Sequence, residues 1–127
     1  MSAAEPSNGV DHVVVEFPAA AGYRGVGRLV LGGLSSRFEL PVDRVEELLL
    51  ALESLITQEL AADVVRMETS AGASALRTRV GPFASSQLSD DSVARVLRPL
   101  VDDVSEQDGP DGYWVELAVS AARSSGG

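Results

Sequence analysis

The chain has 127 residues, of which 45% are hydrophobic and 23% charged, a composition typical of a globular domain and not of a disordered segment. Cysteine is absent, which excludes disulfides and thiolate metal sites, so a reducing compartment is expected. The net charge of −9 and the pI of about 4.4 argue against direct binding to nucleic-acid phosphates.

Both ends of the chain resemble tails, because residues 1–11 and 123–127 are mostly small and polar, and we expect residues 12–122 to form one domain. The opening MSAAEPSNGV has no basic region followed by an apolar run, so no export signal is expected. No apolar run approaches the length of a membrane span. We therefore expect a cytoplasmic protein without membrane contacts.

The first part of the domain predicts a strand followed by a helix. The run HVVVEF, starting at His12, is rich in β-branched residues and predicts a strand. The segment FPAAAGYRGVGRLVLGGLSSRF places Tyr23, Val26, Val30 and Leu34 at helical spacing. Each glycine in it costs about 1 kcal/mol relative to alanine, so tertiary packing must hold this helix.

The second helix has the clearest pattern in the chain. Pro41 and Asp43 are start signals, and Asp43 with Glu46 has the spacing of a capping box. A continuous apolar stripe follows, formed by Val45, Leu48, Leu49, Leu52, Leu55 and Ile56.

The rest of the domain predicts a hairpin, a third helix and a last strand. Alternating runs on either side of SAGAS predict an antiparallel hairpin over residues 63–80. The segment SDDSVARVLRPLVDDVSEQ predicts a helix that kinks or breaks at Pro99, before the turn DGPDG and the strand YWVELAVSA. The apolar face of this third helix is formed by Val93, Val96, Leu97, Leu100, Val101 and Val104.

The order strand, helix, helix, hairpin, helix, strand indicates an α+β fold. We expect a two-layer α/β sandwich, with a mostly antiparallel sheet and helices on one face. The sequence contains no internal repeat and no second domain.

Several residues could suggest chemistry, but structural roles explain them better. His12 is the only histidine and lacks the partners of a zinc site or a catalytic triad. The stretch GYRGVGRLV is only a partial dinucleotide motif, because Val30 replaces its third glycine. No metal site is expected, since no calcium-loop spacing exists among the acidic residues Asp90, Asp91, Asp102, Asp103, Glu106, Asp108 and Asp111.

The order of elements, and several stretches between Val13 and Ala121, resemble the bacterial anti-sigma factor / serine-protein kinase family. LALESLITQEL is similar to the nucleotide-box helix of that family, typically LAVSELVTNAV. SVARVLRPLVDDVSEQDGPDGYWVELAVS is similar to its C-terminal helix, connection and last strand. The resemblance implies the histidine-kinase-type (GHKL) ATPase fold.

The nucleotide-binding positions of this family are altered in the chain. An ungapped alignment places Ser54 at the general-base glutamate and Gln58 at the Mg²⁺-ligating asparagine, and neither replacement suits its role. Shifting the register by one places Glu53 at the base position but Thr57 at the metal position. Gly81 matches the first glycine of the adenine-binding Asp-x-Gly-x-Gly loop, but the aspartate is missing and the phosphate-binding glycine box has no counterpart. On helical periodicity alone, Ser54 and Gln58 form an ordinary polar flank.

The resemblance implies a protein that works by binding. Arg28 falls at the arginine with which the family contacts the sigma factor and the anti-anti-sigma protein, and Arg24 lies one turn earlier; the alternative is that Arg28 is an ordinary surface arginine. We expect an anti-sigma-like regulator, homodimeric by resemblance, without a functional ATP site, a cofactor or a nucleic-acid ligand. One alternative is an active serine-protein kinase that uses ATP, Mg²⁺ and Glu53 to phosphorylate an anti-anti-sigma protein. Another is a partner-swapping regulator that pairs with an active family member.

Overall fold

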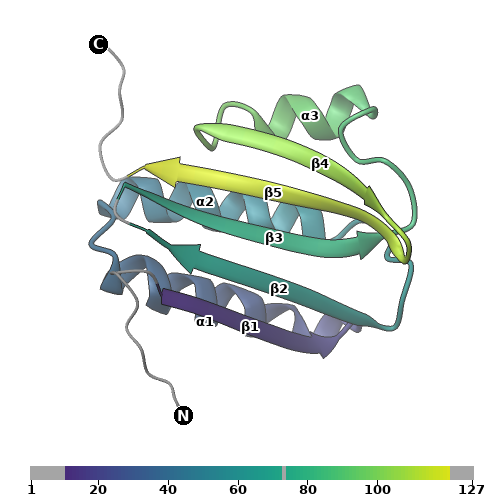
Figure 1. Cartoon of the computed structure of the whole chain (residues 1–127), viewed down its shortest axis with the longest axis horizontal. Helices are drawn as coiled ribbons and strands as arrows, with labels where there is room; N and C mark the ends of the chain where they lie inside the picture. The colour runs from purple at the N-terminus through teal and green to yellow at the C-terminus, as the bar shows by residue number, and fades with distance from the viewer. Residues whose placement is uncertain (1–10, 73, 121–127) are drawn as a thin grey trace.

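The computed structural model describes residues 11–72 and 74–120, which form an α+β fold with a five-stranded antiparallel sheet and three α-helices. Figure 1 shows the sheet in one layer and α1 and α2 in a second layer behind it. The predicted tails lie outside the described residues, except for Asp11, which already belongs to the first strand. The elements are β1 (Asp11–Pro18), the 3-10 turn η1 (Ala21–Tyr23), α1 (Arg24–Arg37), α2 (Val42–Ile56), β2 (Val64–Ala71), β3 (Ala75–Phe83), α3 (Asp91–Leu97), β4 (Asp103–Gly109) and β5 (Gly112–Ser120).

The strands lie in the order β1-β2-β3-β5-β4, so β1 and β4 are the two edges of the sheet. The first strand, the hairpin and the last strand are confirmed, with β2 and β3 paired from Arg66–Gly81 to Ala71–Leu76. Alternate residues of each strand face the helices, as the period of two requires. This inner face and the two long helices enclose the core; we call the opposite, helix-free face the outer face.

The second predicted helix is confirmed as α2, and its leucines form the centre of the core. Leu48, Leu52 and Leu55 are each at most 1% exposed. The capping-box prediction is wrong, because the helix starts earlier than expected. Pro41 is the N-cap residue, without a side-chain cap, and Asp43 lies inside the first turn. There its carboxylate faces the positive end of the helix dipole, which still favours an acidic residue.

The first predicted helix is confirmed as η1 and α1, and its buried face agrees with the predicted one in part. Leu34 is buried, and Val26 and Val30 pack partly buried against the core. Tyr23, however, is 49% exposed, and the buried residues also include Gly27 and Leu31. Gly27 has no side chain, which lets α1 approach β1 closely. A Cβ at this position would lie only 3.1 Å from Cζ of Phe17. The predicted start was also early, since Phe17 belongs to β1.

The prediction of a long third helix is wrong beyond its first two turns. Helix α3 ends at Leu97, two residues before Pro99, and residues 103–109 form strand β4 instead. Val96, expected on the buried face, is 45% exposed. Val101 and Val104 are buried, but they reach the core from a turn and from a strand. Strand β4 pairs with β5 through the predicted turn at residues 109–112.

Candidate functional site

The structure brings Arg28 and Glu53 together on the helix layer. Arg28 lies on α1 and Glu53 on α2, and Nη1 of the arginine donates to Oε2 of the glutamate. The two side chains are 50% and 44% exposed. The proposed partner-contacting residue and the alternative general base therefore form one solvent-accessible ion pair between the two helices.

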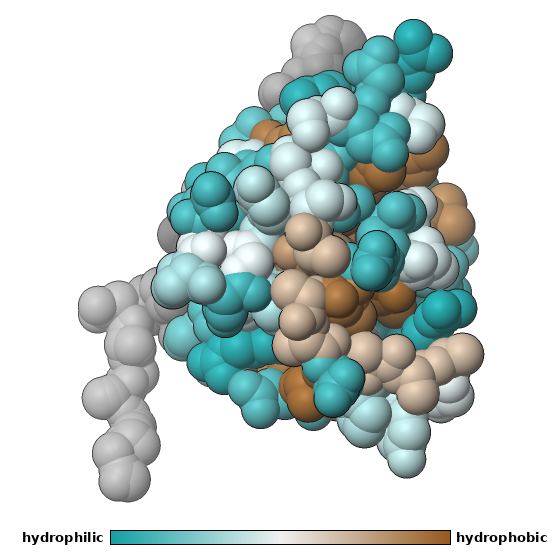
Figure 2. All heavy atoms as spheres, turned by 90° about the vertical axis from the view of Figure 1, so that its right-hand side faces the viewer, coloured by the Kyte–Doolittle hydropathy of each residue, from teal (hydrophilic) through white to brown (hydrophobic). Residues whose placement is uncertain are grey.

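This ion pair lies in a cavity of about 260 Å³ at the end of the layer where α1 begins and α2 ends. Arg24 also lines the cavity, and it has no ion-pair partner within the part of the chain that the structure describes. Figure 2 views this end of the molecule and shows apolar atoms exposed between hydrophilic side chains. We call this cavity the Arg28 site, lined by Arg24, Gly25, Arg28, Glu53, Ile56 and Thr57.

A second depression continues from the Arg28 site along the helices. It has a volume of about 380 Å³ and shares Gly25 and Arg28 with the first. Leu29 is 78% exposed at its rim. A Cβ at Gly25, Gly32 or Gly33 would meet nothing within 4 Å, so bare helix backbone borders open space here. We call this depression the α1–α2 groove, lined by Gly25, Arg28, Leu29, Gly32, Gly33 and Leu49.

The charge of α1 is opposite to that of the whole chain. Its sequence RGVGRLVLGGLSSR contains three arginines and no acidic residue, whereas the chain carries a net charge of −9. The surface around the Arg28 site is therefore locally favourable for an anionic group. Sequence reasoning identified Arg24 and Arg28 but missed Leu29, Gly32 and Gly33; the glycine-rich composition of the helix was the signal that could have found the groove.

Ser54 and Gln58 do not take part in the Arg28 site. They lie half-buried in the last turn of α2 and just beyond its C-terminal end, where Nε2 of Gln58 donates to the main-chain oxygen of Ser54 over 3.0 Å. Oγ1 of Thr57 donates to the same oxygen over 2.9 Å. Helix C-termini leave carbonyl groups without intrahelical partners. These polar side chains therefore have a structural role in closing α2.

Gly81 lies apart from the other predicted nucleotide positions. It belongs to β3, and a Cβ there would lie 2.8 Å from Cδ2 of Trp114 on the outer face. The indole thus packs directly on the glycine backbone. The structure does not bring Gly81 together with Ser54, Gln58 or Glu53, which belong to α2 and its C-terminal end in the other layer.

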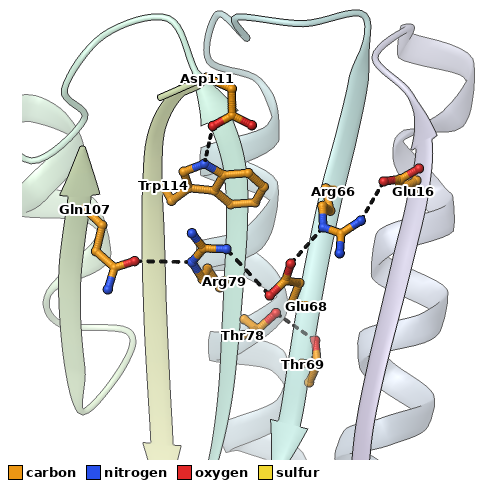
Figure 3. A network of polar contacts seen from close by, with 9 residues as sticks. All are labelled: Glu16, Arg66, Glu68, Thr69, Thr78, Arg79, Gln107, Asp111 and Trp114. Atoms are coloured by element: carbon orange, nitrogen blue, oxygen red, sulfur yellow. Dashed lines mark hydrogen bonds and ion pairs between the residues drawn. The ribbon is translucent and has the colours of Figure 1, made fainter. Parts of the chain in front are cut away.

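The outer face carries a network of paired charges, shown in Figure 3. Arg66 donates to Glu16 and to Glu68, in both cases over 2.7 Å, and Arg79 lies 3.5 Å from Glu68. The guanidinium of Arg79 also stacks on Trp114, 4.1 Å from the ring centroid. The hydrogen bond from Arg66 lowers the pKa of Glu68 below its ordinary value. These charges satisfy one another, unlike Arg24 on the helix layer.

Several of the acidic residues considered as cation ligands have structural partners. Asp90 caps α3 by accepting from the backbone N–H of Ser92 over 2.9 Å, and hydrogen bonds from this serine lower the pKa of Asp90. Glu106 accepts from the backbone N–H of Gln87 over 2.6 Å, and Asp111 accepts from the indole N–H over 3.1 Å. Among the described residues, no three His, Asp or Glu side chains are grouped so as to hold a metal ion.

Asp102 ties the start of α2 to the end of β5. Its Oδ2 accepts from Arg44 over 2.7 Å and from the backbone N–H of Ser120 over 2.7 Å. Arg44 is only 4% exposed and donates also to Glu47 over 2.9 Å. Partial burial alone would raise the pKa of Asp102, but the Ser120 hydrogen bonds and Arg44 bring it below its ordinary value. This carboxylate therefore stabilises the fold in its ionised form.

Comparison with known proteins adds no relative. No known family model matches the sequence, and no match is found among curated proteins. Within the described ranges, none of the helices is long and apolar enough to cross a membrane. Function must therefore be inferred from the residues and contacts described above.

Proposed function

We propose that the protein is a regulator that binds a partner protein through the Arg28 site and the α1–α2 groove. In the manner of the anti-sigma factors that its sequence resembles, it would hold a sigma factor away from RNA polymerase in the cytoplasm. An anti-anti-sigma protein would compete for the same surface. The histidine-kinase-type fold, with its nucleotide site lost, is part of this proposal.

The observation that carries the proposal is the exposed ion pair beside an arginine without an ion-pair partner among the described residues. An exposed ion pair contributes only about 0–1 kcal/mol to stability. Because Arg28 is half exposed, a carboxylate of a partner can replace Glu53 at little cost to the fold. Arg24, in the same cavity, can bind the same anionic segment.

The groove supports a protein ligand more than a nucleotide. Ligand pockets usually enclose about 300–1,000 Å³; the α1–α2 groove, at about 380 Å³, lies within this range and the Arg28 site, at about 260 Å³, lies below it, so the lining decides more than the size. The exposed Leu29 and the bare backbone of Gly32 and Gly33 give the groove an apolar strip. Apolar contacts next to an arginine anchor are a common composition of protein interfaces.

An ATP-dependent serine-protein kinase is the second candidate, favoured by the presence of Glu53 and two arginines in one cavity. Glu53 would act as the general base and the arginines would hold phosphates. However, one of the two arginines, Arg28, already donates to Oε2 of Glu53, so it would have to leave this carboxylate in order to hold a phosphate. Partner binding without phosphoryl transfer is therefore the preferred function.

The first test is a pull-down of the tagged protein from its own cell lysate, with and without Mg²⁺-ATP, followed by mass spectrometry. Equal recovery of a sigma factor in both conditions is expected. Recovery that requires ATP would favour the kinase instead, and recovery of no sigma factor in either condition would refute the anti-sigma proposal.

Charge-reversal variants then test the Arg28 site. Arg28→Glu should abolish partner binding, and the swap Arg28→Glu with Glu53→Arg should leave binding lost while restoring the ion pair. If the swap restored binding, Arg28 would only support the fold. Arg95→Glu is the matched control, since Arg95 is 82% exposed on α3, and it should bind normally.

A further inference from the structure

The two edges of the sheet differ in how they are protected. An edge strand presents unpaired backbone N–H and C=O groups, and natural proteins usually guard such edges with charged side chains. Strand β4 follows this rule, because DVSEQDG contains three acidic residues. Strand β1, DHVVVEFP, has three consecutive valines at its centre, and Val14 is 42% exposed. Within the described part of the chain, β1 is therefore the edge suited to accept a further strand.

One hydrogen bond shows which backbone groups β1 turns to its free edge. The N–H of Ala19, directly after the strand, donates to the main-chain oxygen of Asp63 on the β2 side over 2.8 Å. These groups alternate in direction along an antiparallel strand, and β1 pairs with β2 without a shift in register. Pro18, which has no N–H, thus faces the free edge, where no ladder hydrogen bond is lost. The other residues whose backbone groups point away from β2 are His12, Val14 and Glu16.

Helix α1 forms an apolar wall behind this edge. Figure 1 shows α1 behind β1, along the same border of the sheet. Val26 and Val30, one turn apart, are only partly buried against the core. By helical rotation they lie on the flank of α1 that is turned away from α2, opposite to Arg28 and Gly32. A strand added to β1 would place every second side chain against this flank.

We propose that the β1 edge binds an extended segment of another protein as an added antiparallel strand, in which apolar and polar residues alternate and a basic residue lies opposite Glu16. Antiparallel pairing is slightly more stable per residue than parallel pairing. In strand addition to an open sheet edge, main-chain hydrogen bonds give affinity and the contacts of alternate side chains give specificity. This surface goes beyond the proposed partner binding, because it lies on the other flank of α1 from the α1–α2 groove.

The apolar residues of the segment are those that face inward. They lie opposite Val13 and Val15, which are both only partly buried at the edge. From there they also reach the flank of α1 formed by Val26 and Val30, so that two apolar side chains of the segment cover four valines. A segment with the alternation shifted by one residue would turn these apolar side chains to the outer face instead.

The basic residue follows from charge complementarity. The side chain of Glu16 is 54% exposed beside the free edge. One of its oxygens accepts from Arg66 over 2.7 Å, which leaves the other oxygen for a second cation. Opposite charges directly across two strands attract, and like charges repel. The net charge of −9 on the whole chain also favours the approach of a basic segment.

The test is an amide NMR titration of the full chain with a synthetic peptide. The capped peptide TRVTVTT can place its arginine opposite Glu16 and its two valines opposite Val13 and Val15. Saturable shifts are expected for the amide signals of His12, Val14 and Glu16, because their N–H groups acquire acceptors. No saturable shift at β1 would overturn the proposal. Broadening of the β1 signals with protein concentration alone would place a second copy at this edge, and would overturn it too.

A charge swap tests the register. The control peptide TEVTVTT, with glutamate in place of arginine, should bind the wild type roughly fivefold more weakly, because like charges then lie opposite each other. Glu16→Arg should reverse this preference, while Arg66 keeps its hydrogen bond to Glu68. Equal affinity of both peptides for both proteins would overturn the proposal.

A second variant separates this surface from the proposed function. Arg28→Glu disables the Arg28 site and should bind TRVTVTT as tightly as the wild type does. Loss of peptide binding in Arg28→Glu would place the peptide at the Arg28 site and overturn the proposal. Failure to capture a sigma factor, with TRVTVTT still bound at β1, would refute only the proposed function.

Discussion

Replacing Gly32 by alanine separates what α1 needs for folding from what it needs for binding. Glycine in a helix interior costs about 1 kcal/mol relative to alanine. A Cβ at Gly32 meets nothing within 4 Å, so no clash offsets this gain. Gly32→Ala should raise the free energy of unfolding by about 1 kcal/mol. With an unfolding entropy of about 2.1 cal/mol/K per residue, a chain of 127 residues should gain about 4 °C in Tm.

The same methyl group should weaken partner binding, because Gly32 lines the α1–α2 groove. Thermal unfolding by circular dichroism measures the first effect, and titration with the captured partner measures the second. Gly27→Ala is the control within the same helix, since its Cβ would lie 3.1 Å from Phe17 and should give no stabilisation. A fall in Tm for Gly32→Ala would refute the packing argument. A higher Tm with unchanged affinity would remove the groove from the binding surface.

Two further substitutions test the supports of the fold. Asp102→Ala leaves buried Arg44 without the contact at 2.7 Å and should cost about 2 kcal/mol, below the 3–5 typical of fully buried pairs because Asp102 is 35% exposed. The folded-state pKa of Asp102 is lowered, so its contribution to stability is complete above its ordinary pKa of about 3.9 and is lost as the pH falls further. The free energies of unfolding of the wild type and the variant, measured in urea, should therefore converge below about pH 4. Gly81→Ala places a methyl 2.8 Å from the indole of Trp114 and should destabilise by about 1–3 kcal/mol, measured by the emission of this single tryptophan during unfolding. Unchanged stability in either variant would contradict the corresponding contact.

The sequence predicted the helices and strands whose pattern is set by burial. In α2 the leucines recur with the helical period because that face covers the sheet, so the pattern and the structure have one cause. Strand β4 was missed for the opposite reason. As an edge strand it carries charges instead of an apolar alternation, and only Val104 and the turn at residues 109–112 mark it. Pro99 correctly signalled a break in the helix, but it gave no sign of the strand beyond it.

The candidate site was only partly accessible from the sequence. The pattern of charges identified Arg28 and Glu53 separately, but their contact depends on how α1 and α2 are rotated against each other. Gly27 contributes to this packing, because its lack of a side chain lets α1 lie close to Phe17 of β1 and to Leu52 of α2. Gly81 shows the converse case. The resemblance placed Gly81 in a loop, but it lies in strand β3. A glycine is needed at this position because the indole of Trp114 occupies the space of a Cβ.

The strand order has a consequence for how the chain folds. The hairpins β2–β3 and β4–β5 pair neighbours in the sequence, so each can form early and locally. Strand β1 reaches β2 only across residues 19–63, which contain both long helices. Closing this long segment carries a larger entropic cost than closing a hairpin turn. We therefore expect β1 to join the sheet last, after α1 and α2 have packed. The β1 edge of the sheet would then be completed only in a chain whose two long helices have already packed.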